Sequence, residues 1–482
     1  HFLKSFQADI FFDDQKKHIM DAIETTASGH VPYGIGYGIA EQLSEQKNDV
    51  TVIDNDQQLI ENINTSLDVR TINGSGSFPD ILDNAGAKDA DVIIAVTQAD
   101  EVNMIICHMA QILFEIPTKI ARIRSSKFLN PLYENIFTRE NIPIDVIISP
   151  EKEIAESILK NLSLPGAFEI LEFGDSKITL LGVDIEDNCK VVDTKLGNLT
   201  NQYPDLICTV VGINRGNDII VPTQKDVLKV GDEIYLVCES EQVNKVLSIL
   251  GHTESEAHNI IIAGSGNVGL LLAKSLESSK SNINVKLIEL DKEIAERAAA
   301  SLSKSIVLNG NILDKHLLDE AGIDKSDAFV ALTNNDNINF ISSVIAKEMG
   351  AKQTLSLLVD NSYNDLQDRL GIDTLINPRA TTISSILRYL RKGRIRDAHS
   401  LYNGQVEVVE AEVVEASPLI GKQLKEADIP DGLRFGAILR NEQVFRPDGE
   451  TRIELHDRIV ILSLTESIHD VEHFFRTSQD YY

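Results

Sequence analysis

The chain has 482 residues, which is long for a single hydrophobic core, so about two to four domains are expected. Apolar residues make up 43% and charged residues 25%, a balance typical of globular domains. The 74 acidic residues outnumber the 45 lysines and arginines and give a net charge of −29, which argues against a nucleic-acid-binding or membrane-adsorbed protein.

Neither the cysteines nor the apolar runs point to a metal centre or a membrane span. No two of the four cysteines form a CxxC pair, and each lies in or beside an apolar run. Buried thiols in a reducing compartment are therefore expected, and a zinc site is not. No apolar stretch approaches the ~20 residues of a transmembrane helix. The first residues lack the pattern of a secretory signal, so any membrane role would come through a partner.

Residues 1–33 form an atypical N-terminal segment that matches nothing later in the chain. The sequence DAIETTASGHVP, which begins at Asp21, stands where the later pattern would require an apolar strand. We interpret these residues either as a leader or as a part of the repeat that has lost its ancestral pattern.

A first Rossmann-like domain is expected over residues 34–150, with a degenerate glycine loop. Aligning its helix GYGIAEQL with the later GLLLAKSL places Gly36 as the third glycine of the loop. The first two positions are then Val31 and Tyr33, and counting back from the acid Asp54 still leaves the middle glycine missing. Pro32 also lies within this loop. The sequence therefore leaves open whether the first copy binds a nucleotide.

The features of the first domain recur later in the chain at one constant offset. The run NGSGSFPDILDNAGAKDADVIIAVT begins at Asn73, and NGNILDKHLLDEAGIDKSDAFVALT begins at Asn309. The matched pairs are Gly74 and Gly310, Gly86 and Gly322, Thr97 and Thr333, Asp100 and Asp336, and Asn103 and Asn339. The shared register extends over ~100 residues, which indicates a duplication and a second Rossmann-like domain over residues 258–380.

A second, shorter repeat follows each large one. The run GINRGNDIIVPTQKDVLKVGDEIYLV ends at Val237, and GAILRNEQVFRPDGETRIELHDRIVIL ends at Leu462. Both read as short strands separated by polar turns. Small β-rich domains are therefore expected over residues 165–250 and 400–482, with the polar stretch 251–258 as the joint between the halves.

Strands and helices alternate in the large copies, and this order predicts the fold class. In the second copy, the run from Ile260 to Ile262 is expected to be a buried strand, and a helix and a second strand follow it. The fold class is thus α/β, with two tandem Rossmann-like domains that are each followed by a small α+β domain. Right-handed βαβ units place a ligand at the carboxyl edge of such a sheet.

The second copy carries the more specific nucleotide-binding motif. Gly264, Gly266 and Gly269 form GSGNVG between a strand and a helix, and Glu289 ends the next strand. The first glycine permits the tight turn, the second admits a pyrophosphate, and the third allows close packing of helix and strand. Helix N–H groups would bind the phosphates and Glu289 the ribose hydroxyls. Because Leu290 follows, with no arginine for a 2′-phosphate, NAD or an adenine nucleotide is favoured over NADP.

The remaining candidate residues lie around these two clefts. In the second copy they are Ser265, Asn267, Val268, Gly310, Asn311, Thr333 and Asp336. In the first copy they are Gly36, Asp54, Gly74, Thr97, Asp100 and Arg122. The threonines and the aspartates that follow them would either cap a helix or contact a ribose. Arg122, which alternates with Arg124 on an expected strand, would either contact a phosphate or form a salt bridge.

No catalytic group recurs with the nucleotide features. None of the eleven histidines recurs between the copies, and no nucleophile elbow, HExxH motif or phosphate-binding P-loop is present. The small domains show no obvious polar constellation. Duplication of the whole cleft favours a binding protein, and an NAD-dependent oxidoreductase that uses the second copy is the alternative.

The chain has a duplicated large domain with the motifs GSGNVG, IELD, NGN and ALTNND, and a small β-rich domain follows each copy. From about Gly34 to Phe475, this arrangement resembles the TrkA-like regulatory subunits of Trk potassium-uptake systems. The large domains resemble RCK-N (regulator of potassium conductance, or KTN) modules, and the small ones resemble RCK-C modules. The resemblance implies a cytoplasmic, non-enzymatic protein at the inner face of the cell membrane. It implies binding of NAD, NADH or ATP/ADP and a ring, commonly a homotetramer, that gates a membrane potassium-conducting Trk subunit.

Two points stay open beside this resemblance. The basic run of Arg388, Arg391, Lys392, Arg394 and Arg396 stands out on an acidic chain. It would contact a partner or neighbouring protomer, or it forms a solvated helix face. A two-copy regulator of a different transporter class is a further option.

Overall fold

The structure is a computed structural model, and it describes residues 7–11, 35–45, 48–125, 127–129, 135–138, 140–216, 218–253, 256–279, 283–359, 370–390, 395–402 and 405–475. The chain divides into two compact units. The first contains the described residues of 1–154 together with 358–359 and 377–390, and the second contains the rest.

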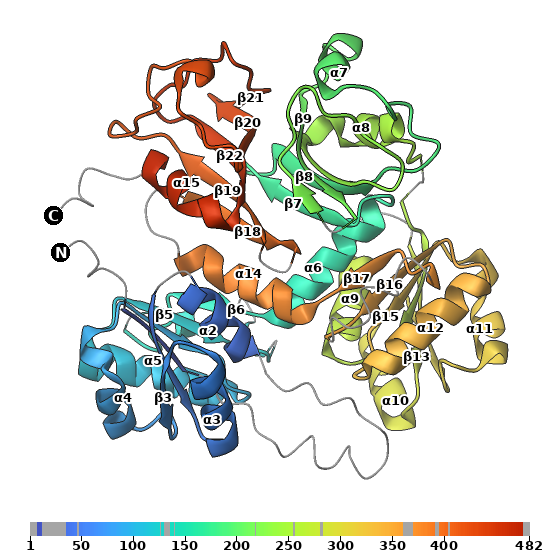
Figure 1. Ribbon diagram of the computed structural model, residues 1–482. Helices are drawn as coiled ribbons and strands as arrows, with labels where there is room; N and C mark the ends of the chain where they lie inside the picture. Colours follow the sequence, from blue (N-terminus) through green and yellow to red (C-terminus); the bar gives the residue numbers. More distant parts are fainter. Residues whose placement is uncertain are drawn as a thin grey trace. The chain divides into compact units, whose positions relative to one another are not determined.

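The first unit is built on a parallel sheet of six strands in the order β3-β2-β1-β4-β5-β6 (Figure 1). Its strands are β1 (Gln7–Phe11), β2 (Asp49–Asp54), β3 (Arg70–Asn73), β4 (Val92–Ala95), β5 (Thr118–Arg122) and β6 (Val146–Ile148). Its helices are α2 (Ile35–Glu45), α3 (Gln57–Ser66), α4 (Pro79–Ala85), α5 (Asp100–Phe114) and the start of α6 (Pro150–Ser163). Every residue of β4 is buried, as expected for a strand covered on both faces.

The central strand of the first sheet comes from the segment that we expected to be foreign to the repeat. Strand β1 pairs in parallel with β2 on one side and with β4 on the other. We predicted no strand in residues 1–33, because the residues just before the glycine loop are not apolar. Backbone N–H and C=O groups of β2 and β4 require a pairing partner whatever its side chains, and Gln7–Phe11 supplies it.

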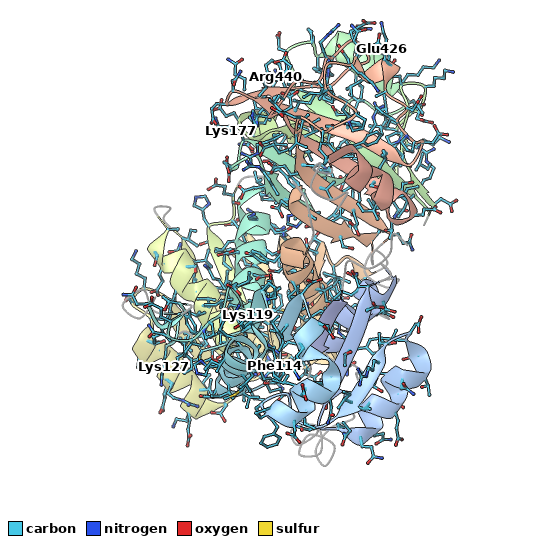
Figure 2. All side chains as sticks on the ribbon, turned by 90° about the vertical axis from the view of Figure 1, so that its left-hand side faces the viewer. Phe114, Lys119, Lys127, Lys177, Glu426 and Arg440 are labelled. Atoms are coloured by element: carbon cyan, nitrogen blue, oxygen red, sulfur yellow. The ribbon has the colours of Figure 1, made fainter. Side chains whose placement is uncertain are left out.

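A buried lysine marks the start of β5 in this unit. Lys119, labelled in Figure 2, is 1% exposed. Its Nζ donates to the carbonyl oxygens of Ile116 at 3.0 Å and Pro117 at 3.3 Å, and pairs with Asp145 Oδ2 at 2.7 Å. The charge is buried only because three oxygen atoms surround it.

The second Rossmann copy repeats this architecture with the sheet order β14-β13-β12-β15-β16-β17. Its strands are β12 (Asn259–Ala263), β13 (Asn284–Glu289), β14 (Ile306–Asn309), β15 (Ala328–Ala331), β16 (Gln353–Leu357) and β17 (Thr374–Ile376). Its helices are α9 (Asn267–Ser278), α10 (Lys292–Ser301), α11 (Lys315–Ala321) and α12 (Asp336–Glu348). The strands and helix that we predicted around the glycine loop are confirmed.

Matched glycines end matched helices in the two copies. Gly86 follows α4 with φ of 91°, and Gly322 follows α11 with φ of 78°. This left-handed conformation is open to glycine without strain, and it lets the cap N–H bond back to the last turn. Gly86 and Gly322 therefore recur in the sequence because the backbone conformation at the end of both helices favours glycine.

Helix α14 (Pro378–Leu390) follows β17 in the chain but packs in the first unit. Ile383 and Ile386 of α14 join the core that contains Ile39 of α2. A Cβ atom on Gly38 would lie 2.4 Å from Cδ1 of Ile383, so glycine is what allows the two helices to approach. The boundary that we expected at residue 380 falls inside this helix.

The small domains are antiparallel sheets of five strands each, in the orders β10-β9-β11-β8-β7 and β21-β20-β22-β19-β18. The first consists of β7 (Glu169–Phe173), β8 (Ile178–Asp184), α7 (Leu196–Gln202), β9 (Cys208–Arg215), β10 (Asp218–Ile220), β11 (Glu233–Glu239) and α8 (Val243–Leu250). The second consists of β18 (Ile395–Leu401), β19 (Val406–Glu412), the 3₁₀ turn η7 (Leu424–Glu426), β20 (Leu433–Arg440), β21 (Gln443–Phe445), β22 (Arg458–Leu464) and α15 (Ile468–Phe475). The α/β class with two Rossmann-like domains and two small domains is confirmed.

The two small domains pack sheet against sheet within the second unit. Their shared apolar cluster includes Val211 and Val237 of the first domain and Leu439 and Leu462 of the second. A Cβ atom on Gly436 would lie 2.7 Å from Val237 Cγ2, which shows how closely the sheets approach.

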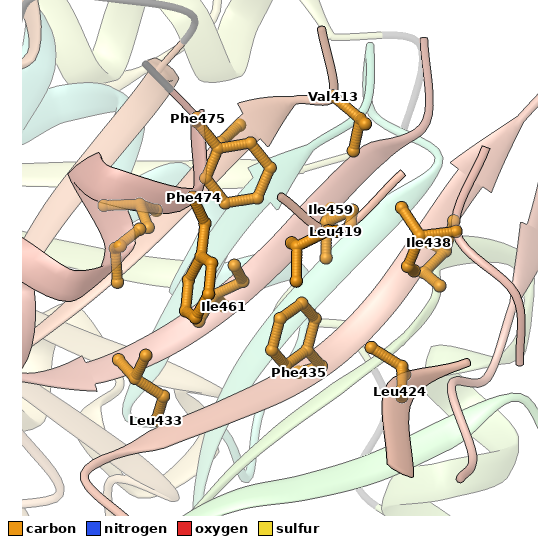
Figure 3. Packing of buried hydrophobic residues seen from close by; sticks show 14 of the residues in the cluster. Val413, Leu419, Leu424, Leu433, Phe435, Ile438, Ile459, Ile461, Phe474 and Phe475 are labelled. Carbon is orange, nitrogen blue, oxygen red and sulfur yellow. The ribbon is translucent and has the colours of Figure 1, made fainter. Parts of the chain in front are cut away.

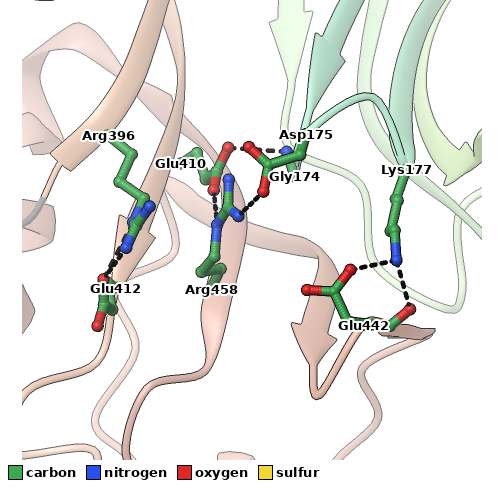
Figure 4. A network of polar contacts seen from close by, with 8 residues as sticks. All are labelled: Gly174, Asp175, Lys177, Arg396, Glu410, Glu412, Glu442 and Arg458. Carbon is green, nitrogen blue, oxygen red and sulfur yellow. Dashed lines mark hydrogen bonds and ion pairs between the residues drawn. The ribbon is translucent and has the colours of Figure 1, made fainter.

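Polar contacts also join the two small domains (Figure 4). Arg458 pairs with Glu410 on its own sheet and with Asp175 of the first small domain. The second oxygen of Glu410 accepts a hydrogen bond from the Gly174 N–H at 2.9 Å. Lys177 pairs with Glu442 across the same boundary. The small domains therefore form one packed body through both apolar and charged contacts.

Candidate nucleotide-binding site

The loop between β12 and α9 has the backbone geometry of a phosphate-binding turn. Gly264 has φ of +100°, and a Cβ atom there would lie 2.9 Å from the carbonyl oxygen of Leu332, which directly follows β15. A Cβ atom on Gly269 would lie 2.1 Å from the Gly264 carbonyl oxygen. These two glycines are therefore required by the fold, the first by its left-handed backbone and the second by the close packing of helix on loop.

Gly266 differs from its two neighbours in the motif. It is the N-cap of α9, with φ of −64° and ψ of −170°, a conformation that other residues also adopt. A Cβ atom there would meet nothing within 4 Å, and Gly266 and Asn267 are both exposed. The fold does not require glycine here, whereas a pyrophosphate that approaches the first turn of α9 does, since a side chain would occupy its place.

Glu289 at the end of β13 is held against this loop. Its Oε2 accepts hydrogen bonds from the backbone N–H and the hydroxyl of Ser265, both at 2.8 Å. Its Oε1 accepts the N–H of Asp291 at 3.1 Å. A carboxylate has about four acceptor positions, so one position on Oε1 can accept a ribose hydroxyl.

The surroundings of Glu289 suit a base and a ribose better than a second phosphate. Leu290 follows Glu289 and is 69% exposed, which provides an apolar surface beside the carboxylate. The negative charge of Glu289 would repel a 2′-phosphate. Both features agree with our preference for NAD or an adenine nucleotide over NADP.

The loop after β14 packs under the same acid. The N–H of Gly310 donates to the Glu289 carbonyl oxygen at 2.9 Å, and so does Asn309 Nδ2, also at 2.9 Å. Asn311 Oδ1 accepts the N–H of Leu313 at 3.0 Å, which orders the turn into α11. Gly310 and Asn311 thus support the position of Glu289, while Val268 lies half-buried in the first turn of α9.

Thr333 and Asn339 fasten the loop after β15 to the start of α12. Asn339 is fully buried, and its Oδ1 accepts from the Thr333 N–H at 2.8 Å and the Thr333 hydroxyl at 2.6 Å. Its Nδ2 donates to the carbonyl oxygens of Thr333 at 2.9 Å and Leu357 at 2.8 Å. The capping role that we considered for the threonine is wrong, because Asn335 caps α12 by accepting the N–H of Ile338. Asp336 is the first residue of that helix.

The first copy repeats these supports around Asp54. Asp54 is 1% exposed, its Oδ1 accepts the N–H of Asp56 at 2.7 Å, and its carbonyl oxygen accepts the N–H of Gly74 at 2.9 Å. Asn103 Oδ1 accepts the Thr97 N–H at 2.9 Å, as Asn339 does in the second copy. Thr97 bonds to Ala99 rather than capping α5 directly.

Two further candidates of the first copy have structural contacts. Both carboxylate oxygens of Asp100 accept backbone N–H groups, from Arg124 at 2.9 Å and Ser125 at 2.8 Å. Arg122 ends β5 at the carboxyl edge of the sheet, where its carbonyl oxygen accepts from Asn103. Arg124 lies beyond the strand and pairs with Glu151 at 3.1 Å.

Several predicted positions fall at or outside the limits of what the structure describes. Gly36 lies buried in the first turn of α2, whereas Val31, Pro32 and Tyr33 lie outside the described residues. In the basic run, Arg391, Lys392 and Arg394 also lie outside them, and Arg396 on β18 pairs with Glu412.

Sequence reasoning missed the polar pairs of the small domains. Arg215 binds Asp232 in the first small domain, and Arg440 binds Asp457 in the second, with the same geometry. The signal was present in the sequence, because the arginine and the aspartate recur at matching places in both short repeats.

Two findings concern other classes of site. None of the helices that the structure describes is long and apolar enough to cross a membrane. Among the described residues, no three or more His, Cys, Asp or Glu side chains gather in a group that could hold a metal ion.

Comparison with protein families identifies both repeats. The TrkA-N domain model matches residues 34–150 and 260–378, and the TrkA-C domain model matches residues 180–251 and 408–476. A 5′-nucleotidase family model matches residues 1–37. Strand β1 therefore comes from a segment that the TrkA-N model does not cover.

Curated relatives match over nearly the whole length. The Trk system potassium uptake protein TrkA of Azorhizobium caulinodans is 43% identical over 93% of this chain and 98% of its own length. The protein of the same name from Halomonas elongata is 36% identical over 93% of this chain and 98% of its own length.

Solved structures share the fold at low identity. The GsuK RCK domain superposes with a TM-score of 0.58 at 14% identity, covering 98% of this chain and 95% of that chain. The GsuK channel bound to NAD superposes with a TM-score of 0.57 at 14% identity, covering 98% of this chain and 79% of that chain.

Proposed function

The chain belongs to the TrkA family of Trk system potassium uptake proteins, and on this premise we propose that it is a peripheral regulatory subunit of a Trk-type potassium uptake system. It binds NAD(H) or an adenine nucleotide, ATP or ADP, in the second Rossmann copy. Binding gates a membrane potassium-conducting subunit through a ring-shaped oligomer, most simply a homotetramer, at the cytoplasmic face of the membrane.

The proposal rests chiefly on the contrast among the three loop glycines. Gly264 and Gly269 are required by backbone contacts, but at Gly266 a side chain would meet nothing within 4 Å. Gly266 lies at the N-terminus of α9, beside the anchored carboxylate of Glu289, and the fold does not need a glycine there. A pyrophosphate does need one, because it can approach the helix closely only where no side chain is present.

Each residue then has a defined binding role. The first-turn N–H groups of α9 donate to the phosphate oxygens, and the helix dipole favours their negative charge. Glu289, oriented by Ser265 and Asp291, accepts a ribose hydroxyl. Leu290 contacts the base through its exposed side chain. The GsuK channel, which shares the fold, has been solved bound to NAD.

Regulation requires that the nucleotide bind one state of the ring more tightly than another. A ligand with equal affinity for both states would shift nothing, however tightly it bound. The loop after β15, fastened by Asn339, and the loop of Gly264 lie against each other through the Leu332 carbonyl. Ligand contacts at the glycine loop would therefore reach α12 through this backbone contact.

An exposed apolar stripe on α5 supports assembly with other copies. Ile105, Ile112 and Leu113 are 44%, 59% and 48% exposed, and the spacing of the first two places them on one helix face. Ile341 of α12, at the position that matches Ile105, is 47% exposed. Apolar side chains grouped in this way are typical of protein–protein contacts.

The direct experiment is a calorimetric titration of the full chain with NADH and, separately, with ATP. We expect one nucleotide per chain if only the second cleft binds, and two if the first cleft also does. Gly266→Val should weaken binding at least about tenfold, which corresponds to about 1.4 kcal/mol, without changing the melting temperature. Glu289→Gln should weaken it similarly. Gly449→Ala, at a distant position of the second small domain with ordinary contacts, is the control.

Three outcomes would count against the proposal. Unchanged affinity in Gly266→Val would show that no pyrophosphate lies at α9. Failure to associate with any potassium-conducting membrane subunit of the same cell would remove the regulatory role. A substrate-dependent absorbance change of the nicotinamide, across a panel of small acids and alcohols, would support the alternative NAD-dependent oxidoreductase.

A further inference from the structure

The first small domain contains a cavity that none of the nucleotide-site residues lines. It lies among β9, β11, α7 and α8 and has a volume of about 190 Å³. Apolar side chains, among them Leu199, Val210, Leu236 and Val246, form much of its wall. An apolar cavity of about 150 Å³ is large enough to bind benzene, so this one admits a molecule somewhat larger than a single aromatic ring.

The two small domains can be compared residue by residue at this place, because both sheets contain the same irregularity. The pairing of β11 with β9 skips Val211, and the pairing of β22 with β20 skips Gly436. Val210 therefore corresponds to Phe435, since each pairs with the residue just beyond the irregularity, Leu236 in one sheet and Ile461 in the other. Helices α8 and α15 have the same length and match end to end.

Three phenylalanines of the second small domain fill the space that the first leaves open. Phe435, Phe474 and Phe475 pack together in its core (Figure 3). The matching residues of the first domain are Val210, Ile249 and Leu250, and all three line the cavity. The cavity is thus a specific difference between two copies of one fold, which arises from smaller side chains at three matched positions.

The cavity also has polar lining residues, and the charged ones come from the second small domain. Arg434 of β20 and Arg446 after β21 both line it. Nε of Arg434 is buried without a hydrogen-bond partner, and so is Oγ1 of Thr209, whose residue is 9% exposed. No ion pair of either arginine is found among the described residues. The third charged residue, Asp448, uses its Oδ1 within its own turn, where it accepts from Glu450 and Thr451.

Buried donors without acceptors are costly in a folded protein unless a ligand satisfies them. Two arginines among the lining residues of a largely apolar cavity favour an anionic acceptor on an apolar body. We propose that this cavity binds a small apolar carboxylate, with its ring or chain among Val210 and Leu236 and its carboxylate against Arg434 and Arg446. Since the site joins both small domains, its occupancy would stabilise their packing.

The test uses the full chain and 4-fluorobenzoate, whose binding is followed by ¹⁹F NMR. We expect saturable binding of one molecule per chain, with a dissociation constant on the order of 0.1 to 1 mM for a ligand of this size. The neutral isostere 4-fluorobenzamide should bind at least about tenfold more weakly. Arg434→Gln should remove this difference, and Lys422→Gln, an exposed charge elsewhere on the same domain, should not.

A second variant tests the cavity itself. Val210→Phe places in the first domain the side chain that the second domain has at the matched position, so it should abolish 4-fluorobenzoate binding and preserve or raise the melting temperature. If that variant does not fold, Ile249→Phe, at the position of Phe474, makes the same test. The proposal is overturned if the benzoate does not saturate below 10 mM, if Val210→Phe or Ile249→Phe binds it unchanged, or if the benzamide binds as well as the benzoate. NADH binding reports on another site, so it distinguishes failure here from failure of the proposed function.

Discussion

Arg440 and Asp457 form a two-point ion pair in the second small domain, with Nε donating to Oδ1 and Nη2 to Oδ2, both at 2.7 Å. Arg215 and Asp232 repeat it in the first small domain, also at 2.7 Å for both bonds. Each aspartate further accepts a backbone N–H from the turn before its strand. Burial raises the pKa of Asp232, but these hydrogen bonds outweigh it and hold that pKa below its ordinary value.

Replacing Asp457 by asparagine should destabilise the second small domain by about 2 kcal/mol, because Arg440 loses the fully buried charge beside it and keeps only its ion pair with Glu454. The exposed pair of Lys425 and Glu450 provides the matched control, and Glu450→Gln should cost less than about 1 kcal/mol. Urea unfolding followed by far-UV circular dichroism measures both. Equal effects of the two variants would contradict a structural role for the buried pair.

Alanine at Gly264 should destabilise the second Rossmann copy by about 2 to 4 kcal/mol. The substitution imposes a left-handed conformation on a residue with a side chain and brings its Cβ to 2.9 Å from a backbone oxygen. Gly269→Ala should have a similar effect, since its Cβ would lie 2.1 Å from another backbone oxygen. Thermal unfolding without nucleotide is the measurement. Gly266→Ala is the control and should leave the melting temperature within about 1 °C.

Glu277 makes the stability of the second Rossmann copy depend on acid pH. Burial raises the pKa of this carboxyl, but hydrogen bonds from the backbone N–H groups of Ser303, Lys304 and Ser305 and from the Ser305 hydroxyl lower it to about 2 overall. The ordinary value of 4.5 applies to the unfolded chain. The stabilisation is therefore fully present above pH 4.5 and is lost as the pH falls towards 2.

Glu277→Gln should accordingly destabilise the protein at pH 7, by about 1 to 3 kcal/mol, and much less near pH 2. Amide hydrogen exchange at Ser303 to Ser305 localises the effect to the turn before β14. The exposed Glu293 offers a control, and Glu293→Gln should show no such pH dependence. A loss of stability that stays constant from pH 7 to pH 3 would contradict the assignment.

The exposed stripe on α5 should be needed for assembly. Ile112→Glu combined with Leu113→Glu places two charges where apolar side chains are 59% and 48% exposed, so the monomer should remain folded while the proposed oligomer dissociates. Light scattering coupled to size-exclusion chromatography reads the mass, and Glu115→Lys near the end of the same helix controls for charge change. An unchanged mass would place the contact between copies elsewhere.

Much of the candidate nucleotide site could be predicted because it lies in short stretches of chain. The turn at Gly264, the helix that follows it and the acid at Glu289 belong to one strand–helix–strand unit, so their spacing alone predicts their geometry. The role of Asn339 could not be assigned in this way. From α12, its Nδ2 bonds to the carbonyl oxygens of Thr333, just after β15, and of Leu357 in β16, and these two strands are neighbours only in the folded sheet.

The sequence by itself determined the duplication, the parallel sheets and the glycine loop, because each depends on local periodicity and backbone conformation. Only the tertiary structure decided which surfaces meet. No sequence pattern indicated that Ile383 of α14 packs against Gly38 of the first copy. Strands pair through backbone N–H and C=O groups, which are the same for almost every residue type. Residues 7–11 could therefore fill the centre of the first sheet without matching the repeat. The cavity of the first small domain also depends on packing, since Val210 leaves space only because its neighbours are small as well.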